Sequence, residues 1–102
     1  MSKQKVSFND IINDETPVLV DFFATWCGPC KAYSPVLQEL KRKEGDSMRL
    51  IKIDVDKNEA LSQKLGVRAM PTTIIFQNGE EKFRAAGVQS IGTLQAALAE
   101  LK

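Results

Sequence analysis

The chain of 102 residues contains no histidine. Histidine is the commonest general base, the usual partner of a catalytic cysteine in hydrolases, and the commonest metal ligand. Its absence excludes a cysteine protease and a zinc site that combines cysteine with histidine in one chain. The two cysteines leave open only a zinc site of four cysteines shared between two chains, and we otherwise expect no metal.

An excess of charge of one sign is also missing. The 14 Lys and Arg residues face 13 Asp and Glu residues, which gives a net charge of +1, and neither sign forms a long block. Such a chain has no field that would gather a polyanion. We therefore expect neither nucleic acid nor a membrane surface as a partner.

Long hydrophobic runs are lacking as well. The longest apolar stretch, from Val18 to Trp26, is interrupted by Asp21 and Thr25, so it predicts no membrane span. The N-terminal residues 1–5 lead into no apolar segment of a signal peptide. One close cysteine pair and no Asn-x-Ser/Thr sequence favour a reducing, cytoplasmic location. The alternative is an exported protein whose signal has been removed.

The residues present predict one α/β domain over residues 1–102. Its 43% hydrophobic residues can bury roughly two-thirds of the unfolded surface in one core. Runs of β-branched residues predict strands, apolar spacings of three and four predict helices, and Asn78-Gly79 predicts a hairpin turn. The predicted elements are a short helix after Ser7, a central strand 18–24, a helix from 28 to about 44, a strand 48–55, a helix 58–65, hairpin strands 72–77 and 80–86, and a helix after Ser90. This order predicts a mixed sheet with helices on both faces.

Both cysteines lie in the motif Trp26-Cys27-Gly28-Pro29-Cys30, directly after the central strand. Positions three apart lie on the same side of a helix, so the two thiols can form a disulfide with little backbone movement. Cys27 lies where the helix begins, and the helix dipole favours its thiolate, so we expect it to be the nucleophile. Cys30, one turn deeper and screened by the helix, is the expected resolving thiol. A purely structural bridge is less favoured, because so short a loop adds little stability.

Asp21 is a carboxylic acid within the apolar central strand. Burial of that strand on both faces would raise the pKa of the Asp21 carboxyl, because burial disfavours the charged form. Such a group can accept a proton near neutral pH. The alternative is an aspartate at the edge of the sheet that points to solvent.

Four segments occur in a characteristic order: Val20–Lys31 with its Trp-Cys-Gly-Pro-Cys motif, Ala69–Thr72 with its Met-Pro-Thr, the Asn78-Gly79 hairpin, and Gly87. In these segments the chain resembles the thioredoxin family, over essentially its whole length. The resemblance implies a thioredoxin fold of the α/β class, with a mixed central β-sheet of about five strands flanked by about four helices on both faces. It also implies a protein-disulfide oxidoreductase that reduces partner proteins and is recharged by a separate thioredoxin reductase.

The expected chemistry needs no bound cofactor beyond the redox-active pair Cys27 and Cys30. The chain has no G-x-G-x-x-G fingerprint for nicotinamide or flavin, so electrons must arrive from another protein. Gly28 and Pro29 carry no titratable group that would further stabilise the reduced thiolate, so we expect a reducing couple rather than a strong oxidant. We also expect a monomer.

The resemblance implies roles for two charged residues near the cysteines. Asp21 is expected to take the proton of Cys30 through water as that thiol attacks. Lys52 matches a family lysine near that aspartate, and we expect the two side chains to form a partly buried pair. The alternative for Lys52 is a side chain that extends to solvent at the sheet edge.

The resemblance also implies a groove that binds an extended segment of the partner protein. Pro71 is expected to follow a cis peptide bond and to lie against the cysteine pair, which leaves the Met70 backbone to pair with the partner. The other expected groove residues are Trp26, Gly28 and Pro29 on an exposed apolar rim, and Gly87 and Val88 on the next loop. For Trp26 the alternative is burial in the core.

Three residues depart from the family pattern. Phe23 replaces a usual tryptophan, Ala69 stands where glycine is common, and Met70 replaces the more frequent isoleucine. These residues bear on partner preference, since a methionine makes the groove softer. The competing class of function is a binding module, in which the fold is a scaffold and the thiols are incidental.

Overall fold

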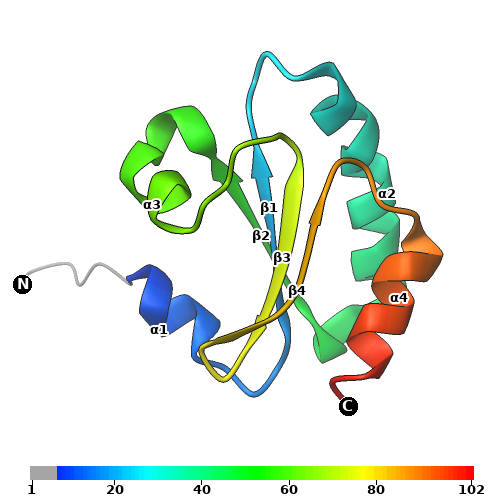
Figure 1. Ribbon diagram of the computed structural model, residues 1–102. Coiled ribbons are helices and arrows are strands. Elements are labelled where there is room, and N and C mark those ends of the chain that lie inside the picture. Colours follow the sequence, from blue (N-terminus) through cyan, green and yellow to red (C-terminus); the bar gives the residue numbers. More distant parts are fainter. Residues whose placement is uncertain (1–6) are drawn as a thin grey trace, which may run out of the picture.

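Four strands form one mixed sheet at the centre of the molecule (Figure 1). The structure is a computed structural model that describes residues 7–102, so the N-terminal residues 1–5 considered above lie outside the described residues. The strands are β1 (Val18–Phe23), β2 (Arg49–Asp54), β3 (Thr72–Gln77) and β4 (Glu80–Ala86), in the spatial order β2-β1-β3-β4. β2 is parallel to β1, whereas β3 is antiparallel to both of its neighbours. The described part of the chain thus has four strands where about five were expected, and the mixed α/β architecture is confirmed.

Helices cover both faces of this sheet. They are α1 (Phe8–Ile12), α2 (Gly28–Glu44), α3 (Glu59–Lys64) and α4 (Ile91–Ala99), with short 3₁₀ turns at Gly45–Ser47 and Val55–Lys57. Figure 1 shows α1 and α3 on one side of the sheet and α2 and α4 on the other. None of the described helices is long and apolar enough to cross a membrane.

The side chains of β1 supply both halves of the core. Because successive side chains of a strand point to opposite faces, Val18, Val20 and Phe22 join one apolar cluster, whereas Leu19 joins the cluster formed by α2 and α4. All four are fully buried, and such burial contributes roughly 1.5–3 kcal/mol for each large side chain. The same alternation places Asp21 on the face of Leu19, beneath α2. The prediction of a central strand covered on both faces is confirmed.

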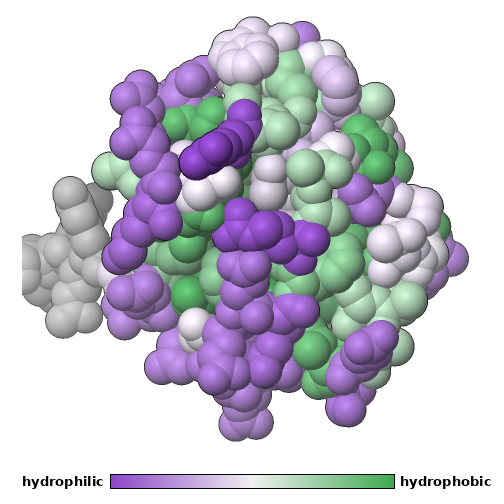
Figure 2. All heavy atoms as spheres, viewed as in Figure 1, coloured by the Kyte–Doolittle hydropathy of each residue, from purple (hydrophilic) through white to green (hydrophobic). Residues whose placement is uncertain are grey.

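The surface is mixed in polarity. Figure 2 shows hydrophilic residues over α3 and over the turn between β3 and β4, with hydrophobic residues reaching the surface between them. Two large apolar side chains are exposed among the described residues, namely Trp26 and Val88. Trp26 was expected on the apolar rim of the groove, and Val88 on the next loop that completes it.

Candidate active site around Cys27 and Cys30

Cys27 and Cys30 are joined by a disulfide at the start of α2, with their Cα atoms 5.3 Å apart. Cys27 is the N-cap of the helix, in an extended conformation, and its Sγ accepts a hydrogen bond from the Cys30 backbone N–H at 3.2 Å. Pro29 lies in the first helical turn, where its missing N–H leaves no hydrogen bond unmade. The sulfur of Cys27 therefore takes the place that a serine or aspartate oxygen takes in an ordinary helix cap.

Exposure does not distinguish the two cysteines. Cys27 is 5% exposed and Cys30 is 6% exposed, so Cys30 is screened from solvent as expected, and Cys27 is buried to the same degree. What differs is their surroundings, because only the Cys27 sulfur receives the helical N–H and approaches the loop before β3. Position in the helix, rather than depth, separates the two thiols chemically.

The loop before β3 closes over Cys27. The Met70–Pro71 peptide bond is cis, as expected from the resemblance, and the Met70 carbonyl oxygen lies 3.5 Å from Cys27 Sγ. The Gly87 backbone N–H donates to the Pro71 carbonyl oxygen at 2.8 Å, which ties the loop after β4 to the same wall. The structure thus brings Met70, Pro71 and Gly87 together with the cysteines.

An exposed rim lies beside this wall. Trp26 is 67% exposed, so burial of its ring in the core is wrong; Val88, on the loop after β4 rather than on this rim, is 47% exposed. Gly28 and Pro29 are exposed as well. The Trp26 indole Nε1–H donates to Asp56 Oδ2 at 2.8 Å. Sequence reasoning missed Asp56, although the carboxyl ends of the parallel strands β1 and β2 must lie at one edge of the sheet.

Asp21 lies in the centre of the sheet, beneath α2. It is 2% exposed, and its neighbours in register are Lys52 on β2 and Thr73 on β3, so the alternative of an edge aspartate is wrong. Its Oδ1 is buried without a hydrogen-bond partner among the described residues. Burial raises the pKa of the Asp21 carboxyl from 3.8 to about 6, and the positive charge of Lys52 opposes that rise. A carboxyl in this state can both accept and release a proton near neutral pH.

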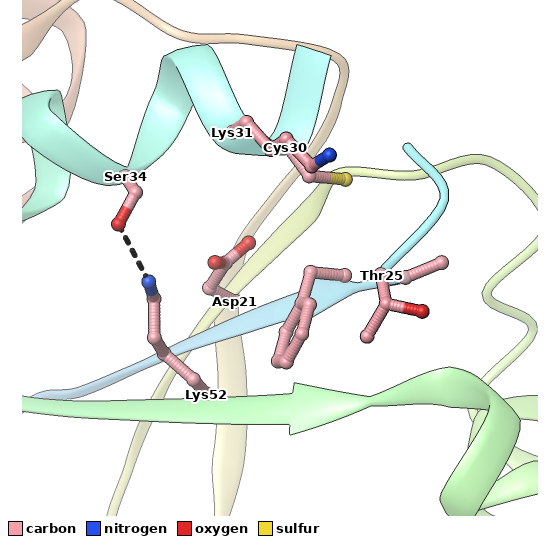
Figure 3. Close-up of a pocket in the computed structure, with 8 residues that line it drawn as sticks. Asp21, Thr25, Cys30, Lys31, Ser34 and Lys52 are labelled. Carbon is pink, nitrogen blue, oxygen red and sulfur yellow. Dashed lines mark hydrogen bonds between the residues drawn. The ribbon is translucent and has the colours of Figure 1, made fainter. Parts of the chain in front are cut away.

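A pocket of about 330 Å³ connects Asp21 with Cys30 (Figure 3). Its lining residues are Asp21, Phe23, Ala24, Thr25, Cys30, Lys31, Ser34 and Lys52. A pocket of this size has room for several water molecules, since one water occupies about 30 Å³ in the liquid. A route for a proton between Cys30 and Asp21 through water is therefore sterically available.

Lys52 borders the pocket but does not form the expected pair with Asp21. Its Nζ donates to Ser34 Oγ at 2.8 Å and lies 6.0 Å from the centre of the Phe23 ring. Within residues 7–102 no ion pair involves Asp21. The direct pairing of Lys52 with Asp21 is thus wrong, because the long lysine stem reaches past the carboxylate to α2. No residue pattern singled out Ser34 in advance.

The described residues contain no group of three or more Cys, Asp or Glu side chains that could hold a metal ion. The polar groups that gather at the site are two sulfurs, one buried carboxyl, two ammonium groups and two hydroxyls. This set suits exchange of electrons and protons between sulfur atoms.

Comparison with known proteins finds a match to the thioredoxin family over residues 1–100. A thioredoxin of Rickettsia typhi is 39% identical over 85 residues, which cover 82% of this chain and 81% of that protein. The chloroplastic thioredoxin Y of Oryza sativa subsp. japonica is 42% identical over 97 residues, which cover 90% of this chain but only 58% of that protein. Among solved structures, the thioredoxin of Malassezia sympodialis superposes with a TM-score of 0.82 at 37% identity, over 91% of this chain and 83% of that one.

Proposed function

Because this chain belongs to the thioredoxin family, and is thus a protein-disulfide oxidoreductase, we propose that it reduces disulfides in other proteins by two-step thiol exchange. Members of the family act on disulfide substrates and are reduced by thioredoxin reductase. The observation that carries the assignment of roles is the position of Cys27 as the N-cap of α2, with the Cys30 N–H directed at its sulfur.

In the first step the Cys27 thiolate attacks one sulfur of the partner disulfide. A new sulfur–sulfur bond forms between Cys27 and the partner, the partner's own bond breaks, and its second sulfur leaves as a thiolate. The helical N–H and the positive end of the helix dipole stabilise the Cys27 thiolate before attack. Cys27 is therefore the nucleophile of this proposal.

In the second step Cys30 resolves the mixed disulfide. Asp21 accepts the Cys30 proton through water in the pocket, and the resulting thiolate attacks Cys27 Sγ. The bond to the partner breaks, and the partner leaves with two reduced thiols while Cys27 and Cys30 are joined. Two electrons have passed to the partner, and a separate thioredoxin reductase returns two electrons to this chain.

The partner protein binds along the wall formed by Met70 and Pro71. The Met70 backbone lies next to the Cys27 sulfur, so an extended partner segment paired with it would bring its disulfide to the nucleophile. Gly87 and Val88 continue this wall, and Trp26, Gly28 and Pro29 form the apolar rim on the other side. The two large apolar side chains that are exposed among the described residues, Trp26 and Val88, belong to the two sides of this surface.

The proposal includes a setting for this activity. We place the protein in the cytoplasm as a monomer without bound cofactor, because one close cysteine pair suits a reducing compartment and the reaction needs only sulfur and proton transfer. Cell fractionation tests the location, and light scattering tests the monomer. Full turnover by protein refolded from urea after exhaustive dialysis tests the absence of a cofactor.

A trapping experiment tests the assignment of the two cysteines. Cys30→Ser leaves the nucleophile without its resolving thiol, so partner proteins are expected to accumulate as mixed disulfides through Cys27. Cys27→Ser is the matched control and should trap nothing. Trapping by the Cys27→Ser variant would refute the assignment. Retention of partners after replacement of both cysteines would instead support the binding module.

A further inference from the structure

Ser34 is the residue on α2 that holds the Lys52 side chain (Figure 3). Its hydroxyl oxygen accepts a hydrogen bond from Lys52 Nζ at 2.8 Å, across the mouth of the pocket that contains Asp21. Lys52 comes from β2 and is the register neighbour of Asp21 on β1. The hydrogen bond therefore links the strand beside Asp21 to the helix above it.

The sheet register alone would permit a direct contact between the two charges. A lysine stem has four rotatable carbon–carbon bonds, and the buried Oδ1 of Asp21 has no partner among the described residues. An opposite charge within about 4–6 Å typically lowers a carboxyl pKa by roughly 1–3 units. Contact with Lys52 would thus return the Asp21 pKa toward its ordinary value and weaken Asp21 as a base.

We propose that Ser34 is a positioning residue, which holds the Lys52 ammonium at the mouth of the pocket and away from the Asp21 carboxylate. Asp21 is then kept free to exchange a proton with Cys30. The proposal rests on the proposed function only for that role of Asp21. The placement of Lys52 by Ser34 is a matter of geometry and can be tested without turnover.

Few other titratable groups face Asp21. From α2 these are Cys30, Lys31 and Tyr33, from β2 it is Lys52, and the facing residue of β3 is the uncharged Thr73. In the oxidised protein Cys30 does not titrate, and burial raises the pKa of the Tyr33 hydroxyl further above its usual 10.0. The positive charge of Lys52 lowers the Asp21 pKa, so the experiment changes the position of the Lys52 ammonium.

Titration of Asp21 in the oxidised protein tests the proposal. The Asp21 carboxyl carbon is followed by ¹³C NMR from pH 3 to 9 in the wild type and in Ser34→Ala. We expect the Asp21 pKa to fall by about one unit in Ser34→Ala, because the released ammonium moves to the carboxylate. In turnover assays the ascending limb of the pH–rate profile should move to lower pH by the same amount. An unchanged or raised Asp21 pKa in Ser34→Ala would overturn the proposal.

Two further variants separate positioning from general structural effects. Ser34→Thr keeps the hydroxyl and should keep the wild-type titration of Asp21. The double variant Ser34→Ala, Lys52→Gln should have the same Asp21 pKa as Lys52→Gln alone. A lower Asp21 pKa in the double variant would also refute the role of Ser34. Ala favours a helix more than Ser does, so Ser34→Ala is expected to fold. Partner trapping by Cys30→Ser reports on the proposed function separately.

Discussion

Replacement of the buried acid by its amide, Asp21→Asn, is expected to stabilise the oxidised protein in a pH-dependent way. In the wild type the folded-state pKa of Asp21 is about 6, whereas the ordinary value is 3.8. Ionisation is therefore harder in the folded chain than in the unfolded chain. At about 1.4 kcal/mol for each pH unit, the difference costs the folded state roughly 3 kcal/mol once Asp21 is ionised.

The sign of this effect fixes the pH window. Below pH 3.8 Asp21 is protonated in both the folded and the unfolded chain, so its ionisation takes nothing from the free energy of unfolding. As the pH rises from 3.8 through about 6, the unfolded chain releases the proton first, and the free energy of unfolding of the wild type falls. Asparagine has no proton to release, so the Asp21→Asn variant should not show this fall.

Urea unfolding of the oxidised proteins, at intervals from pH 3.5 to 8, measures the difference. The two free energies of unfolding should be similar near pH 3.5 and should diverge until the variant is more stable by roughly 3 kcal/mol above pH 7. The same variant should reduce protein disulfides more slowly near neutral pH, since the proton acceptor is lost. Parallel stability curves across the whole range would show that Asp21 does not titrate as the structure indicates.

Two further predictions concern hydrogen bonds around the site. Tyr33→Phe removes the hydroxyl that lies 2.7 Å from Thr73 Oγ1 in the core. We expect the free energy of unfolding, measured in urea, to fall by about 1–3 kcal/mol. An unchanged free energy of unfolding would contradict a role for this pair. Asp56→Ala frees the indole of the one tryptophan, Trp26, at a cost below about 1 kcal/mol, because the bond is exposed. The fluorescence anisotropy of Trp26 should fall, and the KM for a protein disulfide should rise several-fold. An unchanged anisotropy would show that Asp56 does not hold the ring.

Local patterns predicted most of the fold. The hairpin is an example, because Asn78 and Gly79 both have positive φ, as a tight turn between paired strands requires. The run 18–24 was predicted as a strand covered on both faces, and Val18 to Phe22 are all buried. The irregularity between Ile75 and Phe76 on β3 was not predicted, since it depends on how β3 pairs with β4 rather than on either segment alone.

The site was predicted less completely than the fold. The motif around Cys27 showed where the chemistry lies, and the apolar setting of Asp21 indicated a raised pKa. The partner of Lys52 could not be predicted, because neighbouring strand positions fix where a Cα lies but not where a long flexible side chain ends. The similar exposure of the two cysteines was equally hidden, since it depends on how the Met70–Pro71 loop covers the start of α2.

The place of Asp21 beneath Cys30 has a consequence for the electrochemistry of the chain. Closing or opening the disulfide moves two electrons, and the accompanying protons come from two thiols and one carboxyl of the site. Because opening the disulfide places a Cys30 thiol beside this carboxyl, the pKa of Asp21 should differ between the oxidised and the reduced protein, and the slope of the reduction potential against pH should change between those two pKa values, of which the oxidised one is about 6. The two thiols of the reduced protein also bend this curve, so the part that disappears in Asp21→Asn is the part that belongs to Asp21. An electrode or a redox buffer can thus follow the protonation of a group that is almost closed to solvent.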